Sequence, residues 1–125
     1  MSITYQEQDR IFKLDTPRTS YIMGVEDSFG YLLHYYYGKR LHSGDVRYLS
    51  RTWEPPYTPQ RNDRDKLSFL DCAPFEYPMG GIGDFREPCL EIRTAGGHNA
   101  IEAGYRRHRI FRGKEALPGL PAPPV

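Results

Sequence analysis

Residues 75–86 read Phe75-Glu-Tyr-Pro-Met-Gly-Gly-Ile-Gly-Asp-Phe-Arg86, and this stretch decides the fold class of the 125-residue chain. An aromatic-proline pair, a glycine-rich turn and a charged Asp-Phe-Arg follow one another without room for a helix. A short strand and a Gly-Lys turn come later in the chain. We interpret the whole as part of a larger β-domain, and we expect that domain to be incomplete in this chain.

The composition supports an all-β fold. The chain holds 11 Pro and 12 Gly, which favour many turns over long helices. It also holds 10 Tyr and 6 Phe, and tyrosine suits half-buried sheets because it combines apolar area with a polar tip. A chain of 125 residues suffices for one domain and is too short for two.

Alternating patterns predict strands in the first third of the chain. Residues 3–5 and 11–14 form a first predicted hairpin, and residues 19–25 form the next strand. Residues 31–37 follow after a turn at Gly30, with Leu33, Tyr35 and Tyr37 expected on one face. Both faces of this strand are apolar or amphipathic, so we expect both to be covered.

The remainder divides into an arm, a predicted meander and a tail. Residues 41–84 form a long Pro-rich loop or arm in which neither helix nor strand periodicity persists. Residues 89–94 alternate with Leu90 and Ile92 inward, Ala95-Gly-Gly-His98 is a hairpin signal, and two further strands follow at 99–103 and 105–111. Residues 115–125 form an extended tail, and residues 1–125 are taken as a single partial β-sandwich domain.

Six short motifs, spread over nearly the whole chain, occur in the order and approximate spacing of a known family. They are Ser20-Tyr-Ile-Met23, Tyr36-Tyr-Gly-Lys39, Glu76-Tyr-Pro78, Gly83-Asp-Phe-Arg86, His108-Arg-Ile-Phe-Arg-Gly-Lys114 and Leu117-Pro-Gly-Leu-Pro121. In this the chain resembles the N-terminal domain of bacterial α-galactosidases of glycoside hydrolase family 36.

The resemblance implies a fold and a parent activity. Such enzymes carry an N-terminal, galactose-mutarotase-like antiparallel β-super-sandwich and a (β/α)₈ barrel with two catalytic aspartates. They remove terminal α-galactose from melibiose- and raffinose-type sugars with retention of configuration, which requires two closely spaced carboxyl groups. The catalytic barrel is absent from this chain, so no catalytic residue is carried over and we expect the chain to be inactive alone. Its expected partners are α-galactoside sugars, through the parent enzyme.

The resemblance also implies a role for the arm. In the family the N-terminal domain supports homo-oligomers, and one loop, here about residues 48–66, can reach a neighbouring active site. Where members often carry Asp-Arg pairs, this chain has Arg51-Thr-Trp-Glu54 and Arg64-Asp-Lys66. The candidate substrate-binding residues are therefore Trp53, Glu54 and Lys66, although Lys66 lacks the bidentate fork of arginine. Trp53 can equally serve as an interface anchor.

Three other residues are predicted to be structural. Asp84 and Arg86 are interpreted as a latch, in which Asp84 caps backbone amides and Arg86 holds a neighbouring strand. The alternative is an ion pair that faces the sugar. His108 is expected to pack or bond between strands, and His34 to be a hydrogen-bonded strand residue.

The sequence predicts no cofactor, metal, nucleic acid or membrane. Net charge is +1, and the four histidines lack metal-ligand spacing. The glycines of residues 80–83 lack the following Lys-Ser/Thr of a phosphate loop. No apolar signal core or membrane-length stretch is present, and the two cysteines, 17 residues apart, favour a reduced, cytoplasmic protein.

Two functions stay open at this point. The first is a non-catalytic N-terminal portion of an α-galactosidase-like enzyme that serves structure, oligomer assembly and the shaping of the substrate site. The alternative is a free-standing carbohydrate-binding or assembly module, in which Trp53, Tyr57 and the tyrosine-rich strand supply stacking surfaces.

Overall fold

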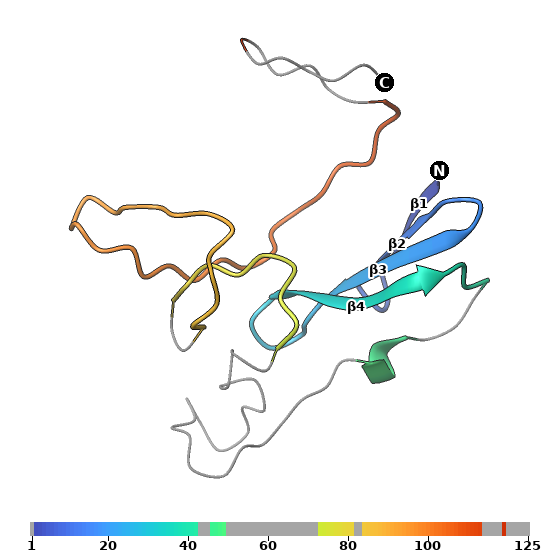
Figure 1. Cartoon of the computed structure of the whole chain (residues 1–125), viewed down its shortest axis with the longest axis horizontal. Coiled ribbons are helices and arrows are strands. Elements are labelled where there is room, and N and C mark those ends of the chain that lie inside the picture. Colours follow the sequence, from blue (N-terminus) through green and yellow to red (C-terminus); the bar gives the residue numbers. More distant parts are fainter. Residues whose placement is uncertain (1, 43–45, 50–72, 82–83, 114–118, 120–125) are drawn as a thin grey trace.

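The computed structural model describes residues 2–42, 46–49, 73–81, 84–113 and 119. Its elements are β1 (Ser2–Gln6), β2 (Ile11–Asp15), β3 (Thr19–Val25), β4 (Leu32–Lys39) and a 3-10 helix, η1 (Arg47–Leu49). The strands form one antiparallel sheet in the order β1-β2-β3-β4 (Figure 1). The described residues contain no α-helix, and the predicted all-β class and its first four strands are confirmed.

Short turns with satisfied backbone groups join these strands. At the end of β3, the Glu26 carboxylate accepts a hydrogen bond from the backbone N–H of Phe29 at 2.8 Å. Gly30 follows with a φ of 75°, a left-handed conformation that glycine adopts without strain. Because each strand returns directly beside its predecessor, every ladder forms from residues close in sequence.

A β-bulge between β3 and β4 changes the faces that simple alternation predicts. His34 pairs with Met23 but Tyr36 pairs with Ile22, so Tyr35 is an extra residue in β4. Leu33 therefore pairs with Gly24, whereas Tyr37 pairs with Tyr21 on the opposite face. The prediction that Leu33, Tyr35 and Tyr37 share one face is wrong for Tyr37, which is 67% exposed.

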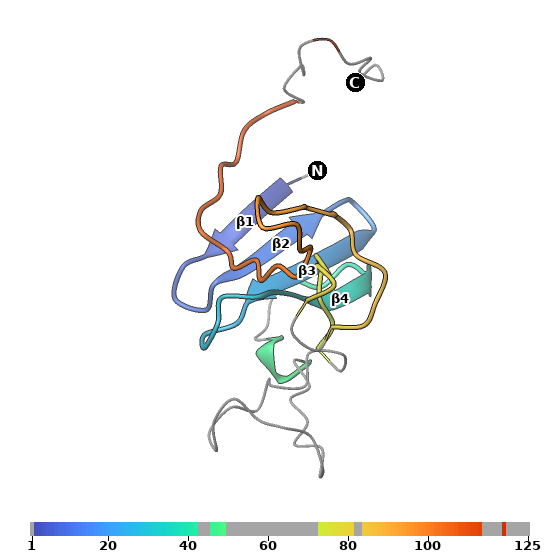
Figure 2. The ribbon, with the colours of Figure 1, turned by 90° about the vertical axis from the view of Figure 1, so that its left-hand side faces the viewer.

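Irregular segments contact both faces of the sheet. On one face Ile11 and Ile22 pack with Val46, next to η1. On the other face Phe12 packs against Tyr105 and His108. Figure 2 shows this C-terminal segment, in orange, crossing in front of β1, β2 and β3.

A third segment runs along the free edge of β4. Phe75 forms an isolated antiparallel bridge with Leu33. The N–H of His34 donates to the Pro74 carbonyl at 2.6 Å, and the N–H of Glu76 donates to the Leu32 carbonyl at 3.0 Å. Residues 74–76 thereby continue the sheet by one short contact and place the Glu76 side chain beside it.

The predicted meander at 89–94, 99–103 and 105–111 does not form strands. The hairpin turn is present, with Gly97 at a φ of 84° and the Thr94 N–H bonded to the His98 carbonyl at 2.9 Å. Leu90 and Ile92, predicted to point inward, are each 42% exposed. The reason is that a strand needs a neighbour for its backbone groups, and the described chain provides none here.

Candidate functional site

A connected group of polar side chains lies where residues 74–76 meet the sheet. Since Phe75 pairs with Leu33, the next residue, Glu76, points to the other face, where Tyr21 and His34 lie. The Tyr21 hydroxyl donates to Glu76 Oε1 at 2.5 Å, and His34 Nδ1 lies 2.7 Å from the same oxygen. The side chains of Glu76 and His34 are 16% and 35% exposed.

Burial and the carboxylate act together on Tyr21. Loss of solvent, then the hydrogen bond and negative charge of Glu76, raise the pKa of Tyr21 to about 12. Tyr21 is thus a protonated donor at any physiological pH. The Glu76 network, meaning Tyr21, His34 and Glu76, therefore joins β3, β4 and the segment beside them by hydrogen bonds between neighbouring side chains.

A second polar contact closes residues 73–86 on themselves. Asp84, whose side chain is 4% exposed, accepts through Oδ1 from the backbone N–H of Arg86 at 3.3 Å and from its Nε at 2.7 Å. Arg86 Nη1 donates to the Ala73 carbonyl, and its guanidinium lies 4.8 Å from the centre of the Phe75 ring. These contacts tie the end of the stretch to its beginning.

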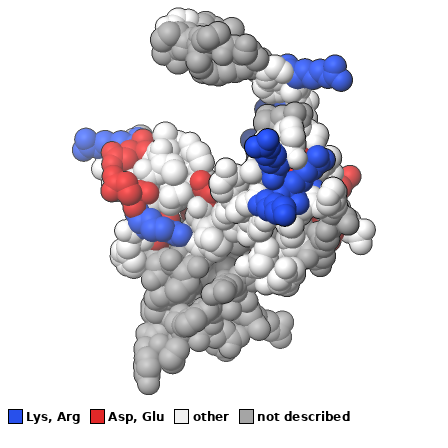
Figure 3. Space-filling view, turned by 45° about the vertical axis from the view of Figure 1, so that its right-hand side comes forward, with Lys and Arg blue, Asp and Glu red and all other residues white. Residues whose placement is uncertain are grey.

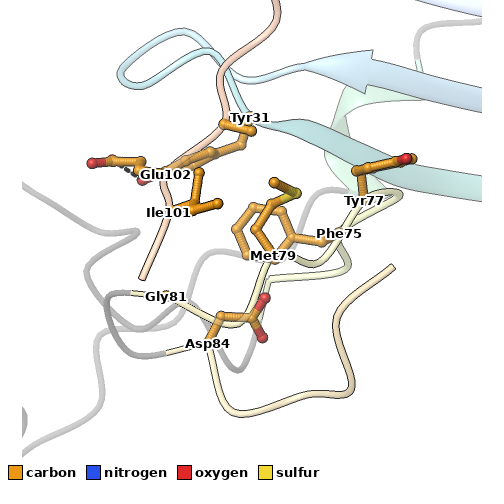
Figure 4. Close-up of a pocket in the computed structure, with 9 residues that line it drawn as sticks. Tyr31, Phe75, Tyr77, Met79, Gly81, Asp84, Ile101 and Glu102 are labelled. Carbon is orange, nitrogen blue, oxygen red and sulfur yellow. Dashed lines mark hydrogen bonds between the residues drawn. The ribbon is translucent and has the colours of Figure 1, made fainter. Parts of the chain in front are cut away.

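A small cavity separates this stretch from residues 101–103 (Figure 4). Its volume of about 20 Å³ holds one water molecule and is too small for a sugar ring. The lining residues are Tyr31, Phe75, Tyr77, Met79, Gly81, Asp84, Ile101, Glu102 and Ala103. The backbones of Gly81 and Ile101 lie close together, since a Cβ on Gly81 would lie 2.5 Å from the Ile101 carbonyl oxygen.

His108 lies in an aromatic cluster on the sheet. Its ring centre is 4.3 Å from Tyr5 and 4.8 Å from Phe12, and its Nδ1 lies 2.6 Å from the Tyr105 hydroxyl. Burial raises the pKa of Tyr105, with a further contribution from neighbouring Tyr5. The cluster holds residues 105–108 against β1 and β2.

Charges of both signs lie on the described surface. Arg47 pairs with Asp9 at 3.2 Å and with Asp27 at 3.1 Å. Figure 3 shows mixed charges on one part of the face in view and a group of basic side chains on another. The basic residues 106, 107, 109 and 112 are all exposed.

The predicted substrate-binding residues Trp53, Glu54 and Lys66 lie outside the described residues, as do Tyr57 and most of the arm and tail. Sequence reasoning missed the partnership of Glu76 with Tyr21 and His34. The signal available was weak, because it required both the Phe75 bridge and the bulge at Tyr35. Within the described ranges, no group of three or more His, Cys, Asp or Glu could hold a metal ion. No helix there is long and apolar enough to cross a membrane.

Comparison with known proteins matches residues 30–125 to the model of the glycosyl hydrolase family 36 N-terminal domain. The α-galactosidase AgaA of Geobacillus stearothermophilus is 34% identical over 122 residues, which cover 98% of this chain and 17% of AgaA. The bifunctional α-galactosidase/sucrose kinase AgaSK of Mediterraneibacter gnavus is 37% identical over 125 residues, which cover 98% of this chain and 13% of AgaSK. The chain thus spans only 13% to 17% of the length of these relatives.

Solved structures agree with the sequence comparison. The galactosidase domain of AgaSK matches 97% of this chain and 17% of its own with a TM-score of 0.84 at 36% identity. The α-galactosidase AgaB of Geobacillus stearothermophilus matches 98% of this chain and 16% of its own with a TM-score of 0.78 at 35% identity. The resemblance seen in the motifs is confirmed: the chain belongs to glycoside hydrolase family 36 and corresponds to the N-terminal domain of its α-galactosidases.

Proposed function

We propose that this chain is the non-catalytic N-terminal β-sandwich portion of an α-galactosidase-like glycoside hydrolase. The parent enzyme would hydrolyse terminal α-galactosides, and this part would serve its structure, its assembly as a homo-oligomer and the shape of its substrate site. One observation carries the proposal: nearly the whole chain superposes on about a sixth of solved α-galactosidases.

The partners of Glu76 and Asp84 support a structural role. Glu76 is engaged by Tyr21 and His34, and Asp84 is engaged by Arg86. A retaining glycosidase instead needs two carboxyl groups about 5–5.5 Å apart across the scissile bond. We therefore assign Asp84 and Arg86 to holding residues 73–86 together, and His108 to fixing the segment that crosses β1 and β2.

Assembly and substrate contact are the finer parts of the proposal. Tyr48, Tyr77 and Phe85 are 79%, 51% and 87% exposed, and these are side chains that a partner subunit would bury. Solved AgaA variants hold raffinose and stachyose, and sugars of this type are the substrates we propose for the parent enzyme. Trp53, Glu54 and Lys66 would contact such a sugar, and the cytoplasm is the proposed location.

A chimera tests the proposal directly. In it this chain replaces the matching segment of AgaB, and hydrolysis of raffinose is measured for the chimera and for this chain alone. We expect activity in the chimera and none in the isolated chain. Lys66→Ala in the chimera should raise KM more than it lowers kcat. Hydrolysis by the isolated chain that disappears in the double variant Glu76→Gln, Asp84→Asn would contradict the proposal.

Calorimetry separates the proposal from the alternative of a carbohydrate-binding module. The isolated chain is titrated with galactose, melibiose and raffinose, and we expect no heat of binding at millimolar sugar. Saturable binding would favour the module.

A further inference from the structure

Residues 89–94 are tied by backbone hydrogen bonds at both ends but have no strand neighbour within the described chain. At one end the Cys89 N–H donates to the Pro78 carbonyl at 2.8 Å, and at the other the Thr94 N–H donates to the His98 carbonyl at 2.9 Å. Between them, the structure gives the backbone of residues 90–93 no hydrogen bond to any described residue. Both ends of the segment are therefore fixed, while its middle offers donors and acceptors that no described residue pairs.

The side chains of this segment carry a strand pattern. Leu90 and Ile92 alternate with Glu91 and Arg93, which is the period of a sheet with one apolar face. Leu90 and Ile92 are each 42% exposed, so the apolar face is only partly covered. Ile110 and Phe111, 48% and 54% exposed, show the same partial cover further along the chain.

The backbone groups that no described residue pairs and the partly exposed apolar face of residues 89–94 define which kind of partner would fit this segment. A partner must satisfy backbone groups on a line and cover every second side chain, and a β-strand does both. A helix in a groove would cover the side chains but leave the backbone groups unpaired. The matched relatives are about six times as long as this chain, so most of their sequence lies outside the part compared and could supply the strand.

We propose that residues 89–94 form an edge to which a β-strand from the remainder of a family 36 polypeptide adds, with Leu90 and Ile92 facing its apolar side. This rests on the proposed function, since it takes the chain as one part of such an enzyme. Residues 89–94 and the added strand then form a β-ladder that is separate from the four-stranded sheet.

Hydrogen exchange in the AgaB chimera tests this pairing. The amides of residues 90–93 should exchange at least about a hundredfold more slowly in the chimera than in the isolated chain. Ile92→Asn should reduce that protection by about tenfold or more. Arg93→Asn is the matched control, because it places the same residue on the opposite face, and it should change protection less than about twofold.

The outcomes separate the inference from the proposed function. An active chimera whose residues 90–93 exchange as fast as in the isolated chain overturns the inference and leaves the proposed function standing. Equal loss of protection in the two Asn variants also overturns it, because the pairing would then lack a defined face. Protection that appears in the isolated chain as its concentration rises identifies a second copy as the partner and overturns it as well.

A second measurement tests the inference in case the chimera fails to fold. The isolated chain is mixed with an AgaB polypeptide that lacks the matching segment, and exchange at residues 90–93 is followed. Slower exchange on complex formation supports the inference. Absence of any complex, together with a chimera that does not fold, overturns both the inference and the proposed function.

Discussion

The sheet of residues 2–39 and the segment 89–113 differ in one respect that decides their structure. Both contain stretches in which apolar and polar residues alternate. In the sheet, each strand is followed within a few residues by the next, and each neighbouring pair forms a ladder, with one bulge between β3 and β4. Residues 89–94 turn back at Gly97, but the returning residues do not pair with them beyond the Thr94–His98 contact. Alternation therefore predicts which side chains share a face, whereas a strand also requires a neighbour.

Replacing an isoleucine in each region should give the largest contrast. Ile22→Ala removes a side chain that is 2% exposed, and the free energy of unfolding should fall by about 2–4 kcal/mol. Ile92→Ala removes a half-exposed side chain and should change it by less than about 0.5 kcal/mol. Urea denaturation of the isolated chain measures both. Equal losses would mean that residues 89–94 are packed as firmly as the sheet.

Glycine substitutions sharpen the comparison at the bulge. A Cβ on Gly24 would overlap the Tyr35 ring, so Gly24→Ala should cost about 1–3 kcal/mol of unfolding free energy. Gly97 has open space around it, and Gly97→Ala should cost about 1 kcal/mol through its positive φ alone. In a double-mutant cycle, Tyr35→Ala should reduce the cost of Gly24→Ala and leave that of Gly97→Ala unchanged. Equal effects of Tyr35→Ala on both would exclude the predicted overlap.

In the sequence, the contact of Arg86 with Asp84 lies between the sheet of residues 2–39 and the segment 89–113. Arg86→Lys keeps the charge but loses the planar fork that reaches both the carboxylate and the Ala73 carbonyl, and it should cost about 1 kcal/mol. Arg107→Lys, at an exposed position, is the control and should be nearly neutral. Thermal unfolding measures the Tm of the two variants, and equal shifts would contradict the structural role assigned to Arg86.

Alkaline pH should also weaken the Glu76 network. The folded-state pKa of Tyr21 is raised from its ordinary value of 10.0 to about 12. The corresponding stability is therefore complete below about pH 10 and is lost as the pH rises towards about 12. Tyr21→Phe should abolish this part of the pH dependence, whereas Tyr37→Phe, at the exposed end of the same face, should retain it. Urea midpoints between about pH 9 and about pH 11.5 measure the difference. If the pH dependence of stability persists in Tyr21→Phe, it arises from the titration of another group.

Sequence reasoning reached the parts of the fold that depend on local signals. The turn at Gly30 and the alternation of β1 to β4 are visible in neighbouring residues, and these strands are confirmed. The bulge at Tyr35 adds a residue that no periodicity indicates, so the faces beyond it were assigned wrongly. Residues 89–94 were predicted as a strand because their pattern is that of one, but pattern alone does not reveal whether a neighbour is present.

The polar contacts also divide into one between residues close in sequence and one between residues far apart in sequence. Asp84 and Arg86 are two residues apart in a glycine-rich turn, so the sequence suggests their contact. Glu76 is 42 residues from His34 and 55 from Tyr21, and their meeting depends on the long-range bridge between Phe75 and Leu33. The roles of Trp53, Glu54 and Lys66 stay predictions, since these residues lie outside the described ranges.

Amide hydrogen exchange of the isolated chain tests most directly whether the sheet is a formed unit and residues 89–94 are not. The account predicts that the hydrogen-bonded amides of β2 and β3 exchange slowly, while those of residues 90–93 exchange within about tenfold of an unstructured peptide. Comparable protection in both regions, at a concentration where the chain is monomeric, would contradict it.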